Sequence, residues 1–182
     1  MRTAPRRHPA MILIFVLPVL LLLAAVVLGL VAKGRGPNGA PTPAPAPAGP
    51  LALPPVDAPD AGSPSCARLL ATLPAELAAS PRPLPRLPLA SPAPEGAVAW
   101  AGVERARPVI LRCGLPRPPE LTPTSALIVI NGVSWLSLSE PDRDTFIAVD
   151  RPVYLALTVP RGLGTGPVQT VSDAVRAALP AR

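Results

Sequence analysis

The feature that most constrains this chain is an apolar run, residues 11–32, in which no side chain is charged and none carries an amide or hydroxyl group. A helix over these 22 residues rises about 33 Å at about 1.5 Å per residue, which is enough to cross a hydrocarbon core of about 30 Å. Helices buried in soluble domains are seldom so long or so uniformly apolar. The sequence therefore predicts a transmembrane helix over residues 11–32.

The charges beside the apolar run predict its orientation. Three arginines lie in the preceding segment, residues 1–10, and only Lys33 and Arg35 follow closely. The positive-inside rule then keeps the N-terminal tail in the cytoplasm and the rest of the chain outside. The alternative is a cleaved secretory signal, but its apolar region would exceed the usual ~7–15 residues and Leu30 is bulky for a cleavage site. An uncleaved signal anchor is the favoured interpretation.

Composition divides the remainder of the chain into a linker and one domain. Residues 33–61 are rich in proline and alanine. Because proline lacks an amide donor and fixes φ, this segment is expected to be an extended linker. Residues 62–182 are enough for a single domain of ordinary size. We therefore expect a cytoplasmic tail (1–10), an anchor (11–32), a linker (33–61) and an extracytoplasmic domain (62–182).

The basic charge of the chain does not indicate nucleic-acid binding. The formal net charge is +6, but residues 61–182 hold twelve arginines against nine acids, which leaves only +3 in the domain. The domain has no run of adjacent basic residues and few aromatic side chains on which bases could stack. The balance is typical of a solvated surface, so no nucleic-acid partner is expected.

Periodicity predicts a mainly antiparallel sheet with two short helices on one face. Ser63-Pro64 is an N-cap signal before an apolar helical face that includes Cys66, and Thr165-Gly166-Pro167 begins a second helix. Asn131-Gly132 between two strand-like runs predicts a type I′ hairpin turn, with a possible bulge between Trp135 and Leu136. The strands are expected at residues 97–101 (an edge strand), 109–113, 126–130, 133–138, 145–149 and 153–159.

Together these elements make an α+β domain with a five- to six-stranded sheet. The proline-rich segment, residues 81–94, has no clear period and is expected to be an extended surface connection. The glycine-rich segment, residues 161–166, lacks the Walker lysine and the Rossmann spacing, so we expect a flexible connection there.

Several of these residues resemble a known family. The resemblance is carried by a cysteine in the first helix, the strand end Leu111-Arg112-Cys113-Gly114, the hairpin Asn131-Gly132-Val133 with Trp135, Asp150-Arg151 before a valine-rich strand, and a final amphipathic helix. Residues 62–180 are similar to an actinobacterial family of membrane-anchored or secreted proteins, domain of unknown function 3515. The resemblance implies an extracytoplasmic domain with paired cysteines, and it implies no activity.

Cys66 and Cys113 are expected to form a disulfide. They are the only cysteines of the chain, and both follow the predicted anchor, on the side where thiols are usually oxidised. Cys66 lies on the apolar stripe of the first helix, and Cys113 shares a strand face with Val109 and Leu111. Both sulfurs should therefore point into one helix–sheet interface. The alternatives are two buried thiols or, less favoured, a redox-active pair.

The inventory of side chains argues against an enzyme. His8, the one histidine, precedes the predicted anchor, so catalysis by Ser-His-Asp or Cys-His and metal sites with histidine ligands are excluded from the outer domain. An acidic group between residues 140 and 150 leaves a hydrolase open, with Asp142 and Asp144 as its carboxylates. A solvated turn is the favoured interpretation of these acids. We expect no catalytic residue, cofactor or metal.

Arg112 and Arg151 are the candidate ligand contacts. Guanidinium groups suit carboxylates and phosphates, so this pair could bind a small anionic ligand, although pairing with Asp150 or Glu104 of the same domain is favoured. The leading hypothesis is a single-pass membrane protein whose non-catalytic outer domain binds a protein or glycan of the cell envelope. The anion-binding domain and the carboxylate-dependent hydrolase are the alternatives.

Overall fold

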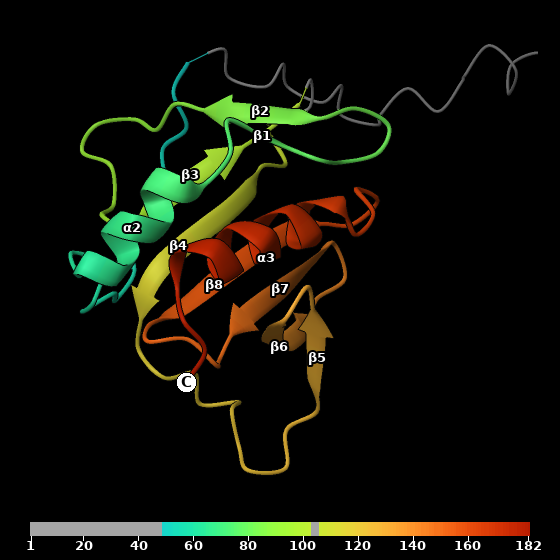
Figure 1. Ribbon diagram of the computed structural model, residues 1–182. Helices are drawn as coiled ribbons and strands as arrows, with labels where there is room; N and C mark the ends of the chain where they lie inside the picture. Colours follow the sequence, from blue (N-terminus) through green and yellow to red (C-terminus); the bar gives the residue numbers. More distant parts are fainter. Residues whose placement is uncertain (1–48, 103–105) are drawn as a thin grey trace, which may run out of the picture. The chain divides into compact units, whose positions relative to one another are not determined.

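The structure is a computed structural model that describes residues 49–102 and 106–182 (Figure 1). The predicted tail, the predicted anchor over residues 11–32 and most of the predicted linker lie outside the described residues. Among the helices that are described, none has the length and apolar character needed to cross a membrane.

The described part of the chain forms one antiparallel sheet of eight strands, in the order β1-β2-β3-β4-β8-β7-β6-β5. Strands β1 to β4 lie side by side in sequence order, and so do strands β5 to β8. The two groups meet in the middle of the sheet, where β8 pairs with β4. The strands are β1 (Glu76–Leu77), β2 (Leu84–Leu87), β3 (Ala97–Trp100), β4 (Val109–Leu115), β5 (Leu127–Ile130), β6 (Val133–Ser139), β7 (Arg143–Ala148) and β8 (Tyr154–Pro160).

The helices α2 (Pro64–Thr72) and α3 (Gly166–Ala178) begin where the sequence predicts. Ser63 caps α2, since its side-chain oxygen accepts a hydrogen bond from the Cys66 amide at 3.3 Å, and a proline occupies the first turn of each helix. Each helix buries one apolar stripe, and Figure 1 shows both helices in front of the same face of the sheet. The predicted α+β class is confirmed for the described residues.

One row of side chains crosses the sheet beneath these helices. Cys113, Leu155, Ala148 and Trp135 are opposite one another on β4, β8, β7 and β6, and directly opposite residues of an antiparallel sheet share a face. At one end of the row Cys113 is bonded to Cys66 of α2, and at the other end Trp135 Nε1 donates to Ser172 Oγ of α3 at 3.0 Å. This face, which we call the covered face, holds the main core.

The opposite side of the sheet, the outer face, carries a smaller apolar cluster. Leu87, Ala99 and Ile110 belong to it, and a segment before α2 packs against them through Leu51. The Leu51 amide donates to the Pro88 carbonyl at 2.8 Å, and the Ala90 amide donates to the Leu51 carbonyl at the same distance. We call residues 49–57 the N-terminal arm.

The strand count differs from the five or six strands predicted. β2 forms within residues 81–94, which were predicted to be a surface connection, and β1 forms just before them, where no strand was predicted. Pro85 has no N–H, yet its carbonyl accepts from the Ala101 amide at 3.1 Å, and the neighbouring Arg86 amide donates to Ala75 at 2.8 Å. The proline-rich stretch can therefore pair through the groups it retains. In consequence, β3 lies between β2 and β4 and is not an edge strand.

The hairpin prediction is confirmed, but the predicted bulge is misplaced. Asn131 and Gly132 have φ values of 49° and 80°, as a type I′ turn requires. The pairing of β6 with both neighbours continues without interruption past Trp135 and Leu136. These consecutive apolar residues point to opposite faces of the sheet and both are buried, so no bulge is needed to explain them. The register shift lies in β4 at Gly114 (φ 84°), where a Cβ atom would collide with the backbone of Ala61.

Candidate functional site

The predicted disulfide is present and lies in the core. Cys66 and Cys113 are bonded with their Cα atoms 5.8 Å apart, and both residues are fully buried. The bond joins α2 to β4 across the covered face. Disulfides persist mainly in oxidising compartments, so this bond indicates an extracytoplasmic domain.

Arg151 is buried and bonded within its own domain. Only 2% of its surface is exposed. Its guanidinium group donates to the Gly132 carbonyl at 2.7 Å and forms an ion pair with Asp150 at 3.1 Å. The same carboxylate accepts from the Ser134 amide at 2.9 Å. Arg151 thus fastens the β5–β6 turn to the β7–β8 loop, which is the internal pairing that the sequence favoured for it.

Arg112 lies on the outer face of β4 and has a different partner. Its Nη2 donates to the Pro54 carbonyl at 2.9 Å, so it holds the N-terminal arm. Desolvation by burial lowers the pKa of Arg112 from its ordinary value, but an arginine remains charged at neutral pH. The structure does not bring Arg112 and Arg151 together: within the described residues they share no partner and no cavity.

The acidic group predicted between residues 140 and 150 is mostly engaged with arginines. Arg143 contacts Glu140 at 2.7 Å, and Arg161 contacts Asp144 at 3.2 Å. The hydrogen bond that Arg143 donates to Glu140, followed by the charge of Asp142, raises the pKa of Arg143. Among the described residues no group of three or more His, Cys, Asp and Glu side chains could hold a metal ion.

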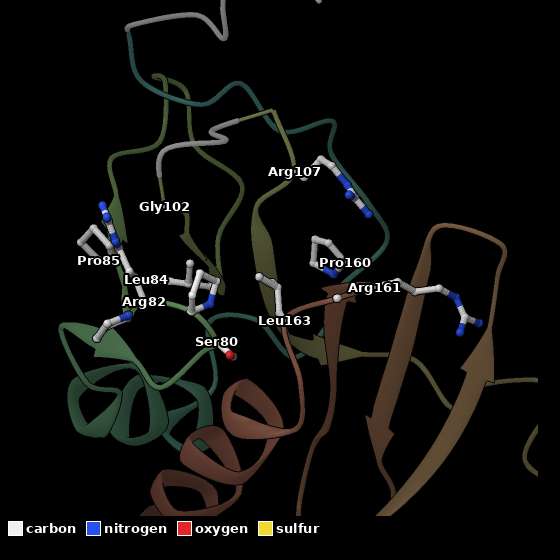
Figure 2. Close-up of a pocket in the computed structure, with 12 residues that line it drawn as sticks. Ser80, Arg82, Leu84, Pro85, Gly102, Arg107, Pro160, Arg161 and Leu163 are labelled. Carbon is white, nitrogen blue, oxygen red and sulfur yellow. The ribbon is translucent and has the colours of Figure 1, made fainter.

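A cavity of about 770 Å³ lies where three connections of the fold meet (Figure 2). The β1–β2 connection and the first residues of β2 form one wall, the β8–α3 connection forms another, and Gly102 and Arg107 lie at its third side. The Ser80 amide donates to the Leu163 carbonyl at 3.3 Å, which joins the first two walls. The described lining residues are Ser80, Pro81, Arg82, Pro83, Leu84, Pro85, Gly102, Arg107, Pro160, Arg161, Gly162 and Leu163.

The cavity wall is apolar, and arginine provides the charged groups of its described lining. Arg107 donates to the Asp142 carbonyl at 3.1 Å, and Arg161 donates to the Glu140 carbonyl at 2.9 Å, so both are drawn toward the β6–β7 turn. In Figure 2 the Arg161 side chain extends sideways from the cavity in that direction. Arg82 is exposed and has no hydrogen bond or ion pair with any described residue. No described residue therefore occupies the donors of Arg82.

Sequence reasoning missed this cavity because its walls are far apart along the chain. The segments around Arg82 and Arg161 were predicted to be surface connections, and each is short, glycine- or proline-rich and without a known binding motif. No local signal connects them. They meet because β8 returns to the middle of the sheet and α3 starts close to Ala78, where a Cβ on Gly166 would lie 2.5 Å from the Ala78 carbonyl oxygen.

A comparison with protein families identifies the chain. The family described as Protein of unknown function (DUF3515) matches residues 15–182. The chain belongs to this family. The DUF3515 match begins inside the apolar run and includes the linker, so it is wider than the resemblance over residues 62–180, and it assigns no activity. Searches of curated proteins and of solved structures found no match.

Proposed function

We propose that this DUF3515 protein is a single-pass membrane protein whose extracytoplasmic domain is a non-catalytic binding module of the cell envelope. The observation that carries the proposal is the 770 Å³ cavity with Arg82 on its lining, since Arg82 has no partner among the described residues. Pockets for small ligands usually have volumes of about 300–1,000 Å³ and apolar walls with a few polar groups that orient the ligand. The cavity has this size and this chemistry.

The lining favours a ligand with an apolar body and one anionic group. Proline rings and the side chains of Leu84 and Leu163 offer apolar surface, and Arg82 offers a guanidinium group that suits a carboxylate or phosphate. We therefore assign the anion-binding role to Arg82 and not to Arg112 and Arg151, whose guanidinium groups are bonded within the domain. An anionic glycan or lipid of the envelope has the required chemistry.

The side chains available support the non-catalytic role in this proposal. The chain has one histidine, His8, which the predicted topology leaves on the cytoplasmic side. Asp142 and Asp144 contact arginines and do not line the cavity. A hydrolase would need two carboxylates facing a bound substrate. The described residues offer no such pair in the cavity.

Crosslinking in intact cells tests the binding proposal. A photoreactive amino acid replaces Leu163, on the cavity wall, in the full-length protein. We expect a crosslinked product, which Arg82→Glu should reduce about tenfold because the substitution reverses the charge. Arg68→Glu is the matched control, since Arg68 is likewise exposed and its side chain has no partner among the described residues. No product, or an equal loss in both variants, would exclude the cavity as the ligand site.

The membrane topology has its own test. A reporter that works only outside the cytoplasm, fused after Arg182, should be active, and the full-length protein should stay with membranes. Release of a soluble form beginning near Lys33 would indicate a cleaved signal. A C-terminal region that resists protease in intact, wall-stripped cells would show that the proposed orientation is wrong.

A further inference from the structure

The edge of the sheet formed by β5 is exposed and apolar. Leu127, Ile128 and Val129 are 43%, 47% and 68% exposed, although all three are large hydrophobic residues in consecutive positions. β5 pairs with β6 on one side, and no strand of the described residues lies on its other side. Natural proteins usually protect such an edge with a charge, a proline or a bulge. β5 has none of these.

The backbone of β5 directs its free groups toward this open edge. Val129 is opposite Ser134 of β6. The Ser134 carbonyl accepts from the Val149 amide at 3.0 Å and the Ser134 amide donates to Asp150, so both groups point away from β5. Val129 and Ser134 are therefore a pair without mutual hydrogen bonds, and the N–H and C=O of Val129 point outward. Because the pattern repeats every second residue, the groups of Leu127 point outward as well.

We propose that β5 pairs antiparallel with β5 of a second copy of this chain. The two-fold axis would pass beside Ile128, so that Leu127 of each copy lies opposite Val129 of the other. In this register all four outward groups of each strand are hydrogen-bonded, in four bonds across the interface. Ile128 of one copy then lies opposite Ile128 of the other, and apolar side chains meet on both faces of the sheet.

A second copy fits this edge for reasons of charge and symmetry. Residues 121–139 contain no charged side chain, and the nearest charges on α3, Asp173 and Arg176, form an ion pair with each other at 3.5 Å. Two copies of a basic domain can therefore approach here without like charges meeting. The opposite edge, β1, is only two residues long, so β5 has no matching partner there. Pairing β5 with β5 closes after two copies.

The length of β5 sets the strength of the dimer. Four residues span only about 14 Å, so the contact lies well below the roughly 1,200 Å² that stable soluble interfaces bury. The dimer is therefore weak and depends on concentration. The dimeric fraction of such a protein is highest when both copies are held at a high local concentration.

Disulfide trapping tests the register. Ile128→Cys in the full-length protein places two cysteines opposite each other at about 4.5 Å between Cα atoms, a distance that a disulfide accepts. Val56→Cys is the matched control, because Val56 is 45% exposed and lies on the N-terminal arm, away from β5. Mild oxidation in intact cells should crosslink the Ile128→Cys protein to a dimer at least tenfold more than the control. Equal crosslinking, or crosslinking to a protein of another mass, would overturn the proposal.

A second variant tests the edge without a new cysteine. Val129→Lys adds a charge to the edge, and Val129 is 68% exposed, so the lysine can reach solvent. We expect the dimer dissociation constant of the full-length protein in detergent, measured by sedimentation, to rise by about tenfold or more, while Val56→Lys leaves it unchanged. Circular dichroism checks that both variants are folded. A folded Val129→Lys protein that dimerises like the wild type would show that the edge is not the interface.

Discussion

The covered face and the outer face of the sheet are stabilised in different ways. On the covered face a disulfide, a buried tryptophan hydrogen bond and a large apolar core connect the sheet to α2 and α3. On the outer face a small apolar cluster and hydrogen bonds to backbone carbonyls hold the N-terminal arm. The comparison indicates that stability resides on the covered face, while the outer face and the cavity can change with less effect on the fold.

The largest effect should come from the disulfide. Replacing Cys66 and Cys113 by alanine removes a crosslink between residues 47 positions apart. In the chain-entropy model the loss is about 4 kcal/mol of unfolding free energy, a large share of the ~5–15 kcal/mol of a typical domain. Urea unfolding of the oxidised and double-alanine proteins measures the difference. A loss below about 1 kcal/mol would show that the covered face does not depend on this bond.

Arg151 and Arg112 allow a matched test of how burial affects the contribution of an arginine to stability. Arg151→Met removes a cation that is almost fully buried beside Asp150. Breaking such a pair should cost about 3 kcal/mol, because the Asp150 carboxylate loses its ion pair and the Gly132 carbonyl loses its donor. Arg151→Lys should restore part of the loss by keeping the charge. Thermal unfolding of both variants is the measurement. Equal stability of the methionine variant and the wild type would contradict the structural role of Arg151.

Arg112→Met is the corresponding change on the outer face. It removes the hydrogen bond to Pro54, which should cost about 1.5 kcal/mol because the donor is charged but only partly buried. Hydrogen exchange at the Leu51 amide should become faster, since the N-terminal arm loses one of its attachments, while amides of β8 remain protected. Faster exchange throughout the sheet would mean that the two faces are not independent.

The smallest effect should come from the exposed acids. Asp142→Asn together with Asp144→Asn removes surface ion pairs, which are worth about 0–1 kcal/mol. We expect an unchanged fold and unchanged cellular function. Complementation of a deletion strain, with protein level and melting temperature as controls, measures this. A folded, normally expressed double variant without function would support the hydrolase alternative.

Local patterns were sufficient for much of the covered face. Alternation placed Val109, Leu111 and Cys113 on one buried face, Asn131-Gly132 defined the hairpin, and the cap signals marked the starts of α2 and α3. The pairing of Cys66 with Cys113 followed from these faces and from the inventory of two cysteines. Each of these inferences concerns neighbours within one helix or strand, where periodicity alone decides which side chains are buried.

The candidate site could not be predicted in the same way. Arg82 and Arg161 lie in segments without periodicity, and their proximity depends on which strands pair in the middle of the sheet. The sequence suggested Arg112, within one predicted strand, and Arg151, just before another, as a pair, but they bond to different parts of the domain. The identity of a partner for an arginine depends on long-range contacts that spacing does not encode.

By itself the sequence determined the family, the α+β class, the hairpin and the cysteine pair, because these depend on composition, short motifs and faces of single elements. Only the tertiary structure decided that β1 and, from the proline-rich segment, β2 extend the described sheet, that Arg112 holds the N-terminal arm, and that β5 is left with an open edge among the described residues. The physical reason is that strand pairing, cavities and edges arise from contacts between distant segments, whose free energy depends on the whole fold.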